Sequence, residues 1–181
     1  MSHVNLIDPA ATTDDRAALL SQVRQAFGTV PNMFRAVANS PAALASMWGA
    51  FGALGGGVIP ARLAEQIAVA VADRNACEYC LAAHTALGRK AGASAAEMAE
   101  AQAGRAADGK TAAALGFSLK LVEHRGQVDG DDVRQLREAG FSEQEIVEIV
   151  AHVALNLFTN YVNVAFDVPL DFPQVPLRRV A

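Results

Sequence analysis

The stretch EQIAVAVADRNACEYCLAAHTALGRKAG, residues 65–92, decides how this chain folds and where its chemistry lies. Its first half is alanine-rich and almost continuously apolar, which favours a buried helix. Its second half is predicted to be another helix, closed by Gly92. Here lie both cysteines of the chain, Cys77 and Cys80, with His84 four residues after the second. The stretch therefore predicts a helical hairpin that carries a chemically reactive motif.

Helical geometry brings the cysteines and the histidine together. At about 100° per residue, Cys80 lies roughly 60° and His84 roughly 20° from Cys77 around the axis. Cα atoms three residues apart on a helix are about 5 Å apart, which a disulfide tolerates. If Asn75 is the N-cap, Cys77 lies in the first turn, where the helix dipole favours a thiolate. His84 favours Cys80 instead, and because it acts directly on that sulfur we expect Cys80 to be the thiolate.

Glu65 lies twelve residues before Cys77, in an apolar part of the preceding helix. Burial there would raise the pKa of its carboxyl group toward values useful in proton transfer. The alternative is a solvated residue near the start of its helix, where the dipole favours negative charge. Spacing alone leaves both interpretations open.

The cysteine pair admits several interpretations. Structural zinc needs about four nitrogen or sulfur ligands, but the chain has two thiols and four histidines, three of them distant from the motif. Covalent haem attachment requires histidine directly after the second cysteine, where Leu81 stands. A thioredoxin-like pair would follow a strand, whereas the preceding segment is predicted to be helical. Two inert buried cysteines remain an alternative to a redox-active dithiol assisted by His84.

A second polar pattern lies on the last long helix, which begins at Ser142. His152, Asn156, Asn160 and Asn163 follow at steps of four, four and three, so they form one ridge on a helix that is otherwise apolar on most sides. The ridge lines a site, lies in a subunit interface or faces solvent as a narrow strip, and the sequence does not choose among these.

Aromatic and sulfur side chains gather upstream of the motif. Met33, Phe34, Trp48 and Phe51 are assigned to the core, although they would also suit an apolar wall beside a reactive thiol. Ser40 before proline at the first helical position begins a helix in this region.

The whole chain is predicted to be all-α. Thr12 and Asp15 occupy capping-box positions before a helix that ends at Gly28, and further helices are predicted over about 110–123 and 142–167. Strand-like alternation and long linkers are both missing. We therefore predict a single domain, 1–181, with a motif-bearing core at about 40–103 and a long helix with an extended tail at about 142–181.

Composition excludes several classes of function. The 181 residues are 52% hydrophobic and carry a formal net charge of −4, so no basic surface for nucleic acid is expected. The beginning of the sequence lacks the pattern of a secretory signal, and no uninterrupted apolar run of about 18 residues predicts a membrane span. A cytoplasmic location is expected, where a close cysteine pair is more typical of catalysis or metal binding than of a structural disulfide.

The motif resembles the core of the AhpD-like alkylhydroperoxidases in the carboxymuconolactone decarboxylase superfamily. The shared pattern is a glutamate, then twelve residues on Cys-x-x-Cys-x-x-x-His, which Glu65, Cys77, Cys80 and His84 match one by one. The similarity extends outward to the segments PNMFRAVANSPAALA and NYVNVAFDVPLDFP, which resemble the peroxidase-related branch.

The resemblance implies an all-α fold, assembly as trimers or hexamers, and reduction of hydroperoxides by the dithiol. It implies that Cys80 attacks the peroxide, Cys77 resolves the product, His84 acts as the base and Glu65 relays the proton. No bound cofactor or metal is expected, and an external dithiol, lipoyl or thioredoxin-like, would supply electrons. No nucleic acid or membrane partner is expected.

Two features depart from the family pattern. Tyr79 stands where some members have a histidine, and the motif lies in the first half of the chain rather than the second. The predicted function is a thiol-dependent peroxidase. The alternative is a non-enzymatic redox sensor or oligomeric scaffold that uses the same cysteine pair.

Overall fold

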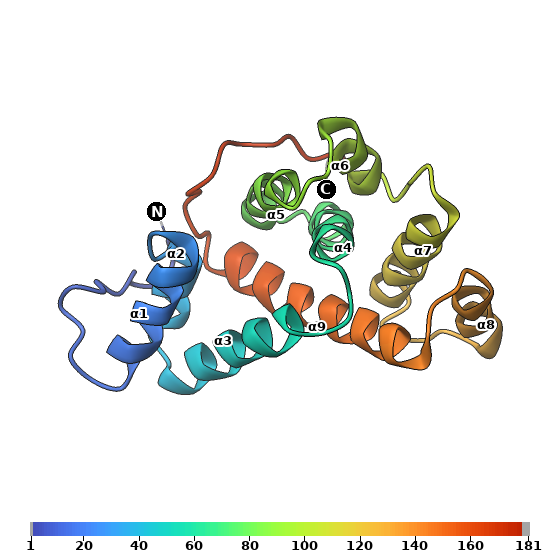
Figure 1. Cartoon of the computed structure of the whole chain (residues 1–181). Helices are drawn as coiled ribbons and strands as arrows, with labels where there is room; N and C mark the ends of the chain where they lie inside the picture. Colours follow the sequence, from blue (N-terminus) through green and yellow to red (C-terminus); the bar gives the residue numbers. More distant parts are fainter. Residues whose placement is uncertain (1, 179–181) are drawn as a thin grey trace.

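The computed structural model describes residues 2–178, and all regular secondary structure in this range is helical (Figure 1). This confirms the predicted fold class. The helices within these residues are α1 Arg16–Phe27, α2 Asn32–Val37, α3 Pro41–Gly55, α4 Ala61–Arg74, α5 Glu78–Lys90, α6 Ala95–Gln102, α7 Gly109–Glu123, α8 Gly130–Glu138 and α9 Glu143–Ala165.

The hairpin of α4 and α5 lies at the centre, as predicted from residues 65–92. α4 contacts α5, α6, α7 and α9, and every residue from Gln66 to Asp73 is buried. A helix covered on all sides must be apolar around its whole circumference, which explains its run of alanine, valine and isoleucine. The turn into α5 passes through Ala76, whose φ of 53° is left-handed and unusual for a residue with a Cβ.

α9 is the long helix along which the other elements pack (Figure 1). It begins at the predicted Ser142, whose side chain accepts from the Glu145 amide while Glu145 accepts from the Ser142 amide. Its buried face contacts α4, α5, α7 and the N-terminal helices α2 and α3. Residues from both ends of the chain are therefore brought to one helix face.

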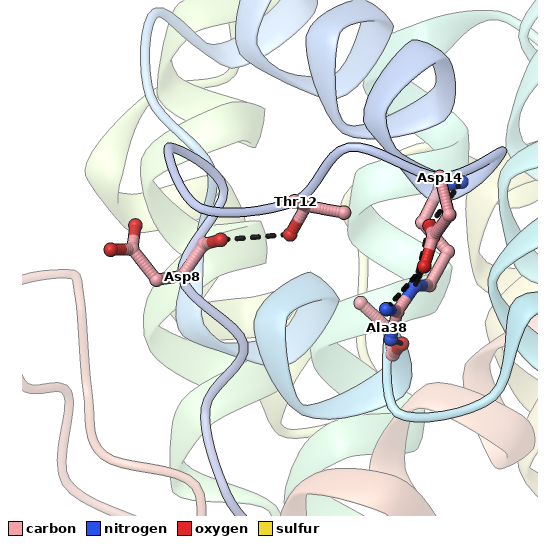
Figure 2. A network of polar contacts seen from close by, with 5 residues as sticks. Asp8, Thr12, Asp14 and Ala38 are labelled. Atoms are coloured by element: carbon pink, nitrogen blue, oxygen red, sulfur yellow. Dashed lines mark hydrogen bonds and ion pairs between the residues drawn. The ribbon is translucent and has the colours of Figure 1, made fainter.

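The predicted capping box before α1 does not form. Asp15 is the N-cap residue but makes no side-chain capping bond. Thr12 instead donates its hydroxyl to the Asp8 carbonyl at 2.8 Å, while Asp14 pairs with Arg16, which also donates to the Ala38 carbonyl (Figure 2). The predicted box fails because α1 begins at Arg16, so Asp15 is itself the N-cap residue and Thr12 lies three residues before it.

The predicted extended tail follows α9 and crosses the face of α5 to reach α6 (Figure 1). Asp171 accepts from the Asn32 amide at 2.6 Å and from the Tyr79 hydroxyl at 2.5 Å. Further on, Gln102 donates to the Pro176 carbonyl at 2.9 Å. Within residues 2–178, no helix has both the length and the apolar character needed to cross a membrane.

Candidate active site

The two cysteines lie at the start of α5, which begins two residues later than predicted. Cys77 is the N-cap residue, and its sulfur accepts from the Cys80 amide at 3.3 Å. The predicted N-cap, Asn75, instead ends α4, and its side-chain Nδ2 donates to Oδ1 of the Asn160 side chain at 2.9 Å. The prediction was wrong because the backbone turns at Ala76, which has a left-handed conformation, and α5 can therefore begin only after this residue. Cys80 thus lies in the first turn of α5, where the helix dipole stabilises its thiolate.

Polar groups from α9 reach the sulfur of Cys80. Asn163 donates its side-chain amide to Cys80 Sγ at 3.1 Å, and Thr159 Oγ1 lies 3.9 Å from the same sulfur. Both cysteines are buried, and no disulfide joins them in this structure. A buried thiolate needs such partners because water does not reach it.

The two thiols differ strongly in acidity. Burial acts to raise the pKa of Cys80, but the hydrogen bond from Cys77, the positive charge of His84 and the amide of Asn163 together lower it to about 6. The pKa of Cys77 is raised, first by the hydrogen bond that it donates to Cys80 and then by burial. The site therefore holds one thiolate, Cys80, and one thiol, Cys77, at neutral pH.

Glu65 and His84 form an ion pair between α4 and α5. Glu65 Oε2 accepts from His84 Nδ1 at 2.7 Å, and the two side chains are 20% and 14% exposed. Burial acts to lower the pKa of His84, but the charge and hydrogen bond of Glu65 and the charge of Cys80 raise it. Glu65 is thus not the solvated residue of the alternative interpretation. Its bond to Nδ1 leaves Nε2 as the nitrogen available for proton transfer.

Two adjoining cavities, both lined by Phe51, His84 and Thr159, lead to this group. The larger, about 160 Å³, also contacts Glu65. The smaller, about 40 Å³, reaches Cys80. Apolar side chains form most of the remaining wall, among them Leu54, Ile59, Ala64, Ala68 and Leu155 in the larger cavity and Met33, Phe34, Leu87 and Phe172 in the smaller. We call the two together the substrate cavity.

The aromatic segment therefore has both predicted roles. Met33, Phe34 and Phe51 line the substrate cavity, whereas Trp48 does not and packs edge-on against Phe34 with ring centroids 5.7 Å apart.

The polar ridge of α9 is buried within the chain, so the interpretation as a solvent-facing strip is wrong. His152, Asn156, Asn160 and Asn163 all turn toward the hairpin and are at most 9% exposed. His152 lines the larger part of the substrate cavity, and its Nε2 is buried without a partner. Burial lowers the pKa of His152. The ridge thus lines a site, as one of the three interpretations proposed.

Sequence reasoning missed Thr159 and the structural role of Tyr79. Thr159 follows Asn156 by three residues and precedes Asn163 by four, so its position on the ridge face was a readable signal. Tyr79 donates to Asp171 and accepts from the Met33 amide at 3.3 Å. It thereby joins α5 to the tail and to α2. Among residues 2–178, no three metal-binding side chains lie together.

The fold and the site define an all-helical protein with a buried, asymmetric dithiol beside a glutamate–histidine pair. A family model described as the carboxymuconolactone decarboxylase family matches residues 41–124. An uncharacterized peroxidase-related protein from Ralstonia eutropha JMP134, described as an alkylhydroperoxidase AhpD core, is 26% identical with a TM-score of 0.82, covering 94% of this chain and 92% of its own. The family match and this structure support membership of the AhpD-like and carboxymuconolactone decarboxylase superfamily.

Other solved structures share the fold. An uncharacterized peroxidase-related protein from Silicibacter sp. TM1040 is 24% identical with a TM-score of 0.80, covering 93% of this chain and 91% of its own. The debrominase Bmp8, as a cysteine-to-alanine variant in complex with 2,3,4-tribromopyrrole, is 20% identical with a TM-score of 0.76, covering 94% of both chains. Among curated proteins, none matches this sequence.

Proposed function

We propose that the protein is a thiol-dependent peroxidase that reduces organic hydroperoxides through a Cys77–Cys80 dithiol and disulfide cycle. The observation that carries the proposal is the thiolate of Cys80 at the wall of an apolar cavity that also exposes the Glu65–His84 pair. The superfamily includes enzymes, and two similar structures are described as peroxidase-related.

The first half of the reaction oxidises Cys80. Its thiolate attacks the terminal oxygen of the hydroperoxide, the O–O bond breaks, and the electron pair leaves with the alkoxide. His84 donates a proton from Nε2 to this leaving group, and Glu65 stabilises the charge on the imidazole beforehand. The products are an alcohol and a sulfenic acid on Cys80.

The second half forms the disulfide. Cys77 loses its proton to His84 and attacks the sulfur of Cys80. The S–O bond of the sulfenic acid breaks, and His84 passes the proton to the departing hydroxide, which leaves as water. An external dithiol then reduces the Cys77–Cys80 disulfide and is itself oxidised. One hydroperoxide is thus reduced to alcohol and water for each donor dithiol that is oxidised.

His152 adds a further polar contact to a cavity whose wall is mostly apolar. Its unpartnered Nε2 can bond an oxygen of the substrate, since a buried nitrogen without a partner costs about 1–3 kcal/mol. The mostly apolar wall, together with a polar group for the peroxide oxygens, favours a hydroperoxide with an apolar body over hydrogen peroxide.

Steady-state loss of cumene hydroperoxide with a panel of dithiols tests the proposal. An enzyme consumes many peroxide equivalents per chain, whereas the alternative, a redox sensor or scaffold, consumes one. Because the debrominase Bmp8 shares the fold, the panel includes a brominated pyrrole. Bromide release without peroxide turnover would replace the peroxidase by a reductive dehalogenase.

A further inference from the structure

The two cysteines open onto different sides of the molecule. Cys80 lines the substrate cavity and Cys77 does not. Cys77 instead lines a separate recess of about 390 Å³, to which Cys80 does not contribute. The recess lies between the start of α5, the end of α9 and residues 167–170, and includes Asn163, Val164 and Leu170. We call it the Cys77 recess.

Tyr79 separates the two spaces. It lines both the substrate cavity and the Cys77 recess. Its hydroxyl is fixed by Asp171 and by the Met33 amide, and its ring packs edge-on against Phe172 with centroids 6.0 Å apart. The partition is therefore held from both ends, and a molecule in one space does not pass directly into the other.

We propose that the oxidised cysteine pair is reduced through the Cys77 recess, by a dithiol that forms its mixed disulfide with Cys77 while the substrate cavity serves the oxidant alone. The inference rests on the proposed function, because it names the route of the reductant at the same site. It gives the two half-reactions two entrances.

The chemistry of the exchange agrees with the geometry. A donor thiolate attacks Cys77 Sγ, the Cys77–Cys80 bond breaks, and its electron pair stays on Cys80. The more acidic thiol is the faster leaving group in disulfide exchange, and Cys80 is that thiol. The second donor thiolate then attacks the donor sulfur that is bound to Cys77. The mixed disulfide breaks, and Cys77 leaves as a thiolate and takes up a proton. The donor ends as a disulfide.

The depth and the charge of the recess limit which donors can reach Cys77. Cys77 is 1% exposed, so the attacking thiol must be presented on a slender arm. The exposed carboxylate of Glu78 also lines the recess. Its charge disfavours anionic donors, and salt screens this effect. A neutral dithiol such as dihydrolipoamide should therefore reduce the protein faster than dihydrolipoate, whose carboxylate is repelled.

Filling each space separately tests the route. The disulfide is first formed with diamide, so the measurement does not require peroxidase activity. Val164→Trp fills the Cys77 recess, Leu54→Trp fills the substrate cavity, and Val58→Trp is a control at an exposed position that lines neither. We expect Val164→Trp to slow reduction by dihydrolipoamide at least about tenfold, and the other two variants to stay within about twofold of the parent.

Oxidation by cumene hydroperoxide should show the opposite pattern, slow in Leu54→Trp and unchanged in Val164→Trp. Failure of oxidation in the parent chain would remove the peroxidase but leave the reduction result intact. Equal reduction rates in all variants, or slow reduction only in Leu54→Trp, would overturn the proposed route.

Mapping the mixed disulfide gives an independent measurement. The diamide-oxidised parent is mixed briefly with β-mercaptoethanol, quenched with acid and fragmented by mass spectrometry. We expect the adduct on Cys77. An adduct mainly on Cys80 would overturn the proposal, whatever the rates of the cavity variants.

Discussion

At Cys80, several effects of modest size lower the pKa of the thiol and together outweigh burial, which raises it. The first turn of α5, the amide of Asn163 and the charge of His84 all stabilise the thiolate. Sequence reasoning had placed the helix dipole on Cys77 and the base on Cys80. The structure removes this conflict, because α5 begins just after Cys77 and so puts Cys80 in the favoured turn.

The thiolate of Cys80 predicts a specific pH dependence. Its pKa in the folded protein lies below the ordinary thiol value, so Cys80 stays ionised at neutral pH and is protonated as the pH falls through about 6. Thiolate absorbance in the ultraviolet should show this midpoint. Asn163→Leu should raise it by about one to two pH units, since a hydrogen bond to a charged group contributes about 1.5–3 kcal/mol. Asn156→Leu, on the same ridge without contact to Cys80, should leave the midpoint in place.

Removing the charge of Glu65 should slow the proposed reaction. Glu65→Gln keeps the size of the side chain but no longer stabilises the imidazolium of His84. We expect peroxide turnover to fall by about 10²-fold, the lower range for acid–base catalysis. The exposed Glu143→Gln serves as the control. Parent-like turnover of Glu65→Gln at every pH would remove Glu65 from the mechanism.

The proximity of the four motif residues could be predicted because their contacts are local to one hairpin. Glu65 and His84 are 19 residues apart and meet wherever two consecutive helices pack side by side. The contact of Asn163 with Cys80 spans 83 residues. Periodicity placed Asn163 on a polar ridge, but only the packing of α9 against α5 shows which group the ridge serves.

At the scale of elements, the serine N-caps were reliable signals, whereas the capping box before α1 and the turn before α5 were not. Ser40, Ser94 and Ser142 all cap helices as their spacing indicates. The turn before α5 was misread because its left-handed residue is Ala76 and not a glycine. No local composition rule identifies such a turn; the packing of α4 against α5 imposes it.

Gly88 sets how closely α5 approaches α4 and α6. A Cβ at this position would lie 3.3 Å from the Cβ of Glu65 and would collide with the end of the Met98 side chain. Gly116 on α7 has open space around it. Gly116→Ala should therefore raise the free energy of unfolding by about 0.5–1 kcal/mol, the usual gain for alanine in a helix.

Gly88→Ala should lose this gain, because Glu65 is fixed in the facing helix, and should lower peroxide turnover by displacing Glu65 from His84. Urea unfolding and steady-state rates of the two variants give the comparison. If Gly88→Ala is as stabilising as Gly116→Ala and fully active, the close approach does not matter to the site.

For the whole molecule, the outer face of α9 is the main unexplained surface. Five of the seven exposed large apolar side chains lie on this helix. An outer stripe runs along it at alternating steps of four and three, formed by Val147, Ala151, Ala154, Phe158, Tyr161 and Ala165. This spacing is typical of a helix that packs along another helix. The polar ridge had suggested a subunit interface, but its residues are buried within the chain. The apolar stripe on the outer face of α9 is now the candidate interface.

We expect the stripe to pack against a second copy of the chain, in the trimer or hexamer that the family resemblance implies. Closed symmetry buries the same apolar stripe on every subunit, which removes an exposed patch that a monomer would leave in water.

Light scattering during size-exclusion chromatography should give a multiple of 18.9 kDa for the parent. Phe158→Glu puts a charge at the centre of the stripe and should shift the mass toward the monomer, whereas Ala96→Glu, at an exposed position of α6, should not. A parent mass near 18.9 kDa at micromolar concentration would show that the stripe faces solvent. The site would then have to work within one chain, which the geometry of Cys80, His84 and Glu65 allows, since all three come from the same hairpin.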